Sequence, residues 1–344
     1  MKNKLNYAVV GLGVGTAHTR AVSMSEGARL AAICDINPAR LEAEGAKYPD
    51  ARRFDDYDDM LANGDVDVVS ICVPSGMHAD FACRALAAGK HILIEKPADV
   101  TVKRALAIRE AQAGTGLRVG VVSQHRWNAV MPPLKEAVDG GVFGKLFMGT
   151  FAVKWYRGQS YYDDPAWHGT WDMDGGGSLI NQSVHTVDLM LWLMGEAASV
   201  RTQYGVFGHE IETEDATASV IRFKSGAVGT LVTTTCAWPG VSTDIQIYGT
   251  GGCVEVDNEA LKVWKVMGGD AAHESAMLSK YGRGNAAFAH EPGFMFGHRA
   301  QVEDMIAAVR DGREPSVTPD DGLRALAFID AAYDSAKTGR DVLL

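Results

Sequence analysis

At 344 residues, the chain is longer than a typical domain of about 150 residues, so two domains are expected. Hydrophobic residues make up 47% and charged residues 22%, which is the balance of a folded globular protein. The net charge of -10 comes with no run rich in lysine or arginine, which argues against a nucleic acid partner. Because no signal peptide and no apolar run of membrane-spanning length is recognisable, we expect a cytoplasmic protein that binds no membrane.

The first third of the sequence alternates short β-branched runs with segments of helical period, including a helix at 75–88. This alternation is typical of βαβ units around a parallel sheet. The expected strands are Leu5–Val10, Leu30–Cys34, Ala51–Phe54, Val66–Cys72, His91–Ile94 and Arg118–Val122. The pattern predicts an α/β Rossmann domain over residues 1–124.

Beyond about residue 145, the sequence changes to longer runs of alternating polarity, which favour antiparallel strands. The expected strands are 145–156, 216–223, 227–236 and 243–248, and the expected helices are 178–194, 299–310 and 321–338. The stretch 268–297 is too long for an ordinary connection, and we interpret it as a lid or an oligomer contact. Residues 125–344 are therefore expected to form an α+β domain with a largely antiparallel sheet.

A glycine-rich segment follows the first expected strand and begins the first helix. Gly11, Gly13 and Val14 fall where the backbone can approach a pyrophosphate at the positive end of a helix. Thr16 replaces the usual third glycine or alanine, so the match to GxGxxG is imperfect. Asp35 ends the second strand, where a carboxylate accepts hydrogen bonds from the adenosine ribose and repels a 2′-phosphate. NAD is therefore expected rather than NADP, the alternative being that Asp35 only caps the next turn.

Two further loops follow the fourth and fifth expected strands. In an open parallel sheet, ligands bind beyond the carboxyl ends of the strands, so both loops are predicted to flank the nicotinamide. The predicted cofactor contacts in these loops and after the sixth strand are Val73, Pro74, His78, Glu95, Lys96 and Gln124. His78 has an alternative interpretation as an ordinary residue at the start of a helix.

These features resemble the Gfo/Idh/MocA family of oxidoreductases over nearly the whole chain. The resemblance rests on a glycine loop followed by His18, a Val-Pro-Ser-x-x-His segment, Glu95-Lys96-Pro97, Arg126, and a helix with His185 and Asp188. It implies a Rossmann domain followed by a domain whose open sheet mediates a homodimer or homotetramer, with substrate bound between the two. It also implies hydride transfer at a hydroxyl-bearing carbon of a sugar, glycoside or cyclitol, with position 3 as one candidate.

A catalytic role is predicted for the helix at 178–194. Asn181, His185, Asp188 and Trp192 recur at helical spacing on one face, and the other positions are largely apolar. Buried polar groups need partners, which a ligand or cofactor would supply. His185 is the candidate base because an imidazole titrates near neutrality, although a satisfied buried histidine is the alternative. The resemblance assigns Lys96 a helper role beside the reacting oxygen.

Asn181 departs from the inositol dehydrogenase-like members of the family, which carry an aspartate at this position. The amide cannot pair electrostatically with His185, but it can orient substrate hydroxyls. Asn181 is therefore kept as a candidate catalytic residue, and inositol specificity is not transferred. A zinc site built from His185, Asp188 and His168 matches no dedicated motif, and no metal is expected.

Aromatic residues concentrate between 155 and 171, where their rings could stack on sugar faces. The alternative is an ordinary aromatic cluster that covers the domain junction. Polar residues shortly after the sixth strand are further candidates for the rim of the pocket. The predicted substrate contacts are Arg126, Asn128, Trp155, Tyr161, Trp167, His168, Trp171 and Asp188.

Three functions compete for this sequence. The leading one is an NAD-dependent dehydrogenase that acts on a CH–OH group of a sugar or polyol. An NAD-dependent glycosidase would use the same oxidation transiently and would cleave a glycoside without net NADH. A non-catalytic NAD-binding regulator is the third, and the intact Lys96 and His185 argue against it.

Overall fold

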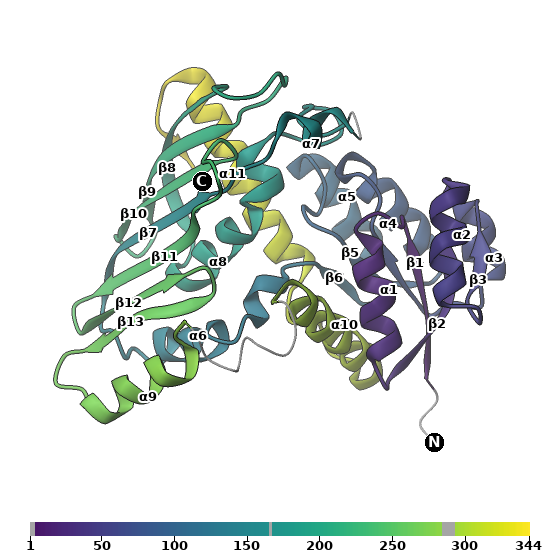
Figure 1. The fold of residues 1–344 in the computed structure, drawn as a ribbon, viewed down its shortest axis with the longest axis horizontal. Helices are drawn as coiled ribbons and strands as arrows, with labels where there is room; N and C mark the ends of the chain where they lie inside the picture. The colour runs from purple at the N-terminus through teal and green to yellow at the C-terminus, as the bar shows by residue number, and fades with distance from the viewer. Residues whose placement is uncertain (1–3, 165–166, 284–292) are drawn as a thin grey trace. The chain divides into compact units, whose positions relative to one another are not determined.

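The computed structural model describes residues 4–164, 167–283 and 293–344, and the chain divides into two compact units (Figure 1). The first unit comprises Met1–Gln124 and Phe294–Leu323, and the second comprises His125–Gly293 and Arg324–Leu344. A single boundary after residue 124 therefore does not describe the division, because a later segment returns to the first unit.

The first unit is built on a parallel six-stranded sheet with the order β3-β2-β1-β4-β5-β6. All six predicted strands are confirmed, with small differences at their ends. They are β1 (Leu5–Val10), β2 (Ala28–Cys34), β3 (Arg52–Phe54), β4 (Val68–Ile71), β5 (His91–Ile94) and β6 (Val119–Val121). This order, with the chain reversing direction of travel between β1 and β4, is that of a dinucleotide-binding Rossmann sheet.

Helices and one late segment complete this unit. They are α1 (Gly15–Met24), α2 (Pro38–Lys47), α3 (Tyr57–Asn63), η1 (Ser75–Met77), α4 (His78–Ala87), α5 (Val102–Gln112) and α10 (Gly293–Asp311). Helix α10 belongs here because its apolar residues Val302, Met305 and Ile306 join a buried cluster with Tyr7 and Leu93 of the sheet. Burial of this apolar stripe explains why the sequence returns to the first unit after residue 293.

The second unit contains an eight-stranded sheet with the order β13-β12-β11-β7-β10-β9-β8-β14. Neighbouring strands are antiparallel except for β7 and β10, so the predicted largely antiparallel sheet is confirmed. The strands are β7 (Leu146–Lys154), β8 (Ala197–Gly205), β9 (Ala216–Phe223), β10 (Val228–Thr234), β11 (Ser242–Gly249), β12 (Gly252–Asp257), β13 (Ala260–Val266) and β14 (Val342–Leu343). Four of them, β8, β12, β13 and β14, lie outside the predicted strands.

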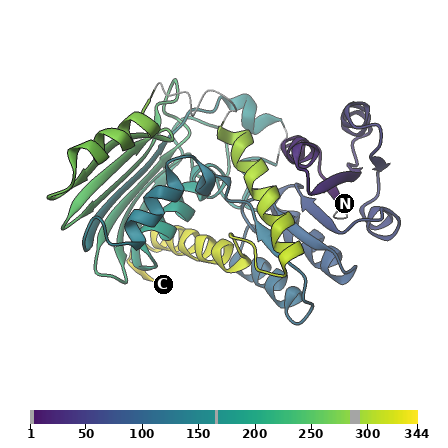
Figure 2. The ribbon, with the colours of Figure 1, turned by 90° about the horizontal axis from the view of Figure 1, so that it is seen from below.

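Helical elements of the second unit pack on this sheet, with contacts to β7, β9, β10 and β13 (Figure 2). The helices that lie wholly or mostly in this unit are η2 (Gln124–Trp127), α6 (Met131–Asp139), α7 (Gln159–Asp163), η3 (Ser178–Gln182), α8 (Val184–Met194), α9 (Ala271–Tyr281) and α11 (Pro319–Thr338). The prediction of one continuous helix at 178–194 is wrong, because a π-helical turn, η3, comes first and Ser183 separates it from α8.

The stretch 268–297, predicted as a lid or an oligomer contact, contains helix α9, which packs on β13. Residues 284–292 of this stretch lie outside the described residues. Within the described ranges, no helix is both long enough and apolar enough to cross a membrane.

Candidate active site

The glycine loop of the first unit combines close packing on one side with open space on the other. Gly11 has a φ of 84°, and a Cβ there would collide with the Cys72 carbonyl at the end of β4. At Gly13, the nearest atom to a Cβ would be a guanidinium nitrogen of Arg40, 3.8 Å away. The Thr16 hydroxyl, at the imperfect position of the motif, donates to the Gly13 carbonyl and closes the turn. The loop thus leaves room above the start of α1, where no side chain caps the free amides.

Asp35 lies at the end of β2 and is almost completely buried. One carboxylate oxygen accepts from the Leu12 amide at 2.6 Å, and the other accepts from the Asn37 amide at 2.7 Å. The second contact is the turn cap that we considered as the alternative, and the first ties the acid to the glycine loop. An ionised carboxylate keeps further lone pairs after two hydrogen bonds, so ribose contacts stay open to it.

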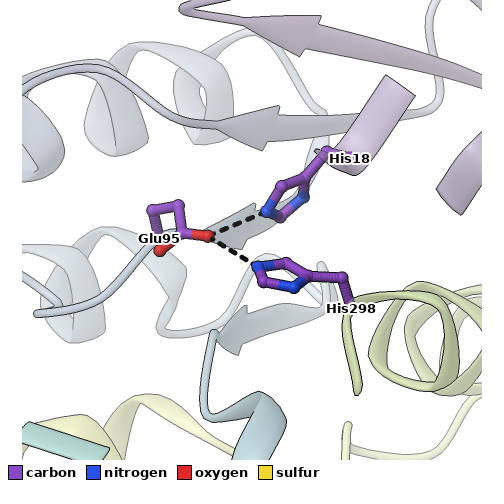
Figure 3. Close-up of side chains that lie close together, drawn as sticks. All are labelled: His18, Glu95 and His298. Carbon is purple, nitrogen blue, oxygen red and sulfur yellow. Dashed lines mark hydrogen bonds and ion pairs between the residues drawn. The ribbon is translucent and has the colours of Figure 1, made fainter. Parts of the chain in front are cut away.

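Glu95 is the centre of a buried polar cluster (Figure 3). Its Oε1 accepts from His18 Nε2 at 3.0 Å and from His298 Nε2 at 3.3 Å, while its Oε2 accepts from the Lys96 amide at 3.0 Å. The chain continues from His18 Nδ1 to Ser70 Oγ at 2.9 Å. Burial opposes ionisation of Glu95, but the two histidine hydrogen bonds outweigh it and hold its pKa well below the usual value.

Glu95, a predicted cofactor contact, uses both of its carboxylate oxygens in hydrogen bonds with protein groups. Glu95 is therefore an anchor that fixes the backbone of Lys96, the half-buried residue that follows it. From the sequence, His18 is recognised only as part of the family resemblance, and His298 is not identified. Nothing in the sequence indicates that residues so far apart bind one carboxylate.

His78 joins the two predicted nicotinamide loops. Its Nδ1 lies 2.7 Å from the Pro97 carbonyl and its Nε2 lies 2.9 Å from the Val73 carbonyl. Burial lowers the pKa of the ring. Both ring nitrogens thus face backbone carbonyls, and the side chain connects the two loops. Val73 and Pro74 are half-buried in the same loop.

The residues of the first unit fit a dinucleotide. Gln124 is almost fully buried, and its Oε1 has no hydrogen-bond partner in the described ranges. A buried amide oxygen without a partner is costly unless a ligand supplies a donor, and the carboxamide of a nicotinamide is one. Together with the space above Gly13 and the uncapped start of α1, this orphaned acceptor supports the predicted cofactor site.

In the second unit, a glycine run and one buried acid hold the start of the segment that carries Asn181 and His185. Glu214 accepts from the amides of Gly177, Ser178 and Leu179 at 3.0 to 3.1 Å, and from Tyr333 Oη at 2.7 Å. A Cβ at Gly177 would collide with the Glu214 carbonyl. Burial raises the pKa of Glu214. Sequence reasoning missed this acid, which lies in a polar stretch without helical or strand periodicity.

Asn181 lies in the π-helical turn and belongs to a polar network. Its side-chain nitrogen donates to Asp174 Oδ1, and its oxygen accepts from Gln182 Nε2 at 2.9 Å. Gln182 Nε2 also donates to Tyr161 Oη at 2.8 Å, and Gln182 Oε1 accepts from Arg157 at 2.9 Å. The shared-face argument for Asn181 is wrong because the turn and Ser183 interrupt the helical spacing. The residues Asp174, Gln182 and Arg157 had not been predicted.

His185 is buried on the first turn of α8, and its ring stacks on that of His125. The ring centroids are 4.4 Å apart and the planes differ by 3°. Stacking on a flat neighbour fixes the plane of the imidazole, which a proton-transferring group requires. His125 is half-buried and was not predicted, because nothing in its local sequence distinguishes it.

Asp188 and Arg126, both predicted as substrate contacts, form a buried ion pair with each other. Arg126 Nε donates to Asp188 Oδ2 at 2.7 Å, and a terminal guanidinium nitrogen donates to Oδ1 at 2.5 Å. The guanidinium also lies over the Trp192 ring, 5.2 Å from its centroid. This two-pronged pair fastens α8 to the segment after β6.

The predicted aromatic residues divide into two groups. Tyr161 stacks on His168 with centroids 4.3 Å apart, Trp167 meets His168 edge-on, and Arg157 lies over both Tyr161 and Trp155. Burial raises the pKa of Tyr161 to about 12. Trp171 instead packs edge-on against Tyr333 and donates to the Glu212 carbonyl at 3.1 Å. Only the first group is connected to the Asn181 network in the described residues, through the hydrogen bond between Tyr161 and Gln182.

Metal-ligating side chains gather at two places in the described part of the chain. One is the cluster of His18, Glu95 and His298, and the other consists of His209, Asp215 and Cys236. In the second, Asp215 accepts from backbone amides of the loop 207–209, and burial raises the pKa of Cys236 to about 11, so the thiol is protonated at neutral pH. Neither cluster contains His185, Asp188 or His168, the residues considered above for a zinc site.

Comparison with known proteins covers almost the entire chain. The GFO_IDH_MocA models match as an NAD-binding Rossmann fold at residues 5–123 and as a C-terminal alpha/beta domain at 135–344, both of an oxidoreductase family. An inositol 2-dehydrogenase from Rhizobium meliloti is 27% identical over 98% of each chain. A D-glucoside 3-dehydrogenase from Escherichia coli is 28% identical over 65% of this chain and 68% of its own. The solved WlbA dehydrogenase from Bordetella pertussis, in complex with NADH and UDP-GlcNAcA, is 32% identical over 99% of each chain with a TM-score of 0.89.

Proposed function

Since this chain belongs to the Gfo/Idh/MocA family of NAD-binding oxidoreductases, we propose that it transfers a hydride at a hydroxyl-bearing carbon of a sugar, glycoside or cyclitol. The observation that carries this proposal is the buried His185 beside His125, in a unit that also holds the network of Asn181, Gln182 and Tyr161. A base next to several neutral hydrogen-bonding groups suits a polyhydroxylated substrate. The relatives named for inositol, glucoside and UDP-GlcNAcA support that class.

The proposed roles follow from the chemistry of the residues. NAD, when bound, accepts the hydride from the carbon or returns it. His185 takes the proton from the hydroxyl as the carbonyl forms, because an imidazole can accept a proton near neutral pH. The ammonium of Lys96, whose backbone Glu95 anchors, stabilises the alkoxide that develops on the oxygen. Asn181 orients neighbouring hydroxyls. Position 3 is the carbon favoured by the glucoside 3-dehydrogenase relative.

The first test is a substrate panel followed at the absorbance of NADH. Purified protein with NAD is offered free sugars, inositols, alkyl glycosides and nucleotide sugars. We expect NADH formation with at least one neutral polyol or glycoside. Cleavage of a glycoside without net NADH would replace the dehydrogenase by a redox-neutral glycosidase. Silence across the panel, together with NAD binding, would leave a non-catalytic regulator.

Asp35 provides a test of the cofactor choice. Replacing Asp35 by serine removes the carboxylate that repels a 2′-phosphate, and Arg40 nearby can then attract that phosphate. We expect the ratio of kcat/KM for NAD to that for NADP to fall by at least tenfold. The control is Asp67→Ser, a change at an acid that meets the Asn6 amide at the start of β1. An unchanged ratio in Asp35→Ser would remove Asp35 from the ribose site.

We also propose that the second unit assembles two copies of the chain through its sheet. On the outer face, Met148, Val220, Val228 and Val232 are 37 to 61% exposed. They come from adjacent strands, since β10 pairs with β7 and with β9. An exposed apolar row on a broad sheet favours contact with an equivalent row, which a two-fold dimer supplies.

A charge in this row should break the assembly. For Val220→Glu we expect the mass in solution to fall to that of one chain, because pairing would bury two like charges about the two-fold axis. Light scattering after size-exclusion chromatography measures the mass. Leu106→Glu, at a partly exposed apolar position on α5 of the first unit, is the matched control and should keep the wild-type mass. A wild-type protein that is already monomeric would contradict the proposed dimer.

A further inference from the structure

The turn between β12 and β13 has an unfavourable backbone that its sequence could have avoided. Asn258 and Glu259 have φ values of 48° and 71°, in the left-handed region. Tight hairpins often require this conformation at both central positions, and asparagine followed by glycine is the usual solution. Asparagine fits the first position, but glutamate at the second is uncommon and strained. Strain of this kind is retained where the side chain has a use.

The half-buried Glu259 carboxyl lies beside the Asn128 side chain. Burial raises the pKa of Glu259, and a hydrogen bond with the Asn128 side chain opposes that rise. Asn128 is only 4% exposed, and its Oδ1 has no hydrogen-bond partner within the described residues. Since the amide nitrogen is the donor to the carboxyl, the oxygen remains as a second, unused acceptor. A buried acceptor without a donor points to a ligand that brings one.

This pair is linked to the proposed base within the second unit. The Asn128 amide donates to the His125 carbonyl at 3.1 Å, and the His125 ring stacks on that of His185. One short segment therefore presents His125 to the base and Asn128 to the β12–β13 turn.

We propose that Glu259 and Asn128 form a substrate subsite that accepts hydrogen bonds from hydroxyl groups and so determines specificity. This inference rests on the proposed dehydrogenase function and deepens it. An ionised carboxylate and an amide oxygen are acceptors only. The subsite therefore selects a part of the substrate that carries hydroxyls and disfavours a carboxylate or phosphate at the same place. The proposal therefore places an uncharged, hydroxyl-bearing part of the substrate next to the β12–β13 turn.

The test uses two variants of Glu259 and a backbone control. Glu259→Gly removes the carboxyl and relieves the strained φ, whereas Glu259→Gln keeps the backbone and removes the charge. Asp65→Gly is the control, because Asp65 also has a positive φ, 51°, but lies in the first unit. The probe is the neutral sugar or cyclitol that gives the fastest NADH formation with the wild-type enzyme, together with its monodeoxy analogues.

We expect KM for the probe to rise about tenfold in both Glu259 variants, with kcat and the Kd for NADH within twofold of wild type. At least one monodeoxy analogue that the wild type discriminates against should be accepted by both variants as well as the parent sugar. Glu259→Gly should melt no lower than wild type, because glycine suits the turn. Unchanged KM values would overturn the proposal, as would a lower Tm of Glu259→Gly with the rise in KM, which would make the carboxyl a structural part of the turn. A wild-type enzyme inactive on the whole panel would instead refute the dehydrogenase function itself.

Discussion

Replacing His185 by alanine is expected to lower kcat by about 10² to 10⁴-fold, the usual contribution of a positioned acid–base group. The Kd for NADH should stay within twofold, because the histidine belongs to the second unit and the Rossmann sheet to the first. Steady-state kinetics and quenching of NADH fluorescence measure the two quantities. A selective loss of kcat separates a chemical role from the alternative of a satisfied buried histidine, which would affect stability first.

The matched control for this change is His273→Ala, at an exposed histidine on α9. It should leave both kinetic constants as in the wild type. If His185→Ala retains full turnover, the base lies elsewhere, and the stacked neighbour His125 becomes the next candidate. If instead the variant loses kcat together with its folded state, His185→Gln, which keeps a polar side chain of similar size, distinguishes the two causes.

Much of the fold could be predicted because the relevant signals are local. Strands such as β1 and β5 are short β-branched runs, and their ends were predicted as observed. The position of α10 in the first unit could not be predicted, since an apolar stripe shows that a helix is buried but not against which sheet. The strands β12 and β13 do alternate in polarity, but they are short and follow a hairpin turn closely. The predicted strands therefore ended before that turn and did not include β12 and β13.

The candidate site shows the same division between local and distant information. Lys96 and Asp35 follow strands in recognisable loops, so the sequence identifies them. The groups that hold the site in place come from far along the chain: His298 reaches Glu95, and Tyr333 reaches Glu214. No periodicity encodes such pairs. The break at Ser183 could not be predicted for a related reason. Apolar residues on both sides of it continue an α-helical pattern in the sequence, whereas the π-helical turn is held by Glu214, a distant residue that binds the amides at its start.

Lys96 gives the second large effect. Replacing it by methionine keeps the length and removes the charge, so the alkoxide loses its stabilising ammonium, and kcat/KM should fall by about 10² to 10³-fold. Lys96→Arg keeps a positive charge in a different shape and should recover part of the loss, which an unfolded loop would not do. The Glu95 cluster anchors the backbone, so the fold of the loop should survive both changes. Methionine at full activity would exclude Lys96 from the reaction.

The double variant Lys96→Met, His185→Ala tests whether one reaction uses both residues. When two groups act as a unit on one transition state, the free-energy effects of removing them do not add. Loss of either group already removes most of the stabilisation that the pair provides together. We therefore expect the double variant to lose far less than the product of the two single losses, close to the larger of them. A loss equal to the product would mean that the two residues act independently.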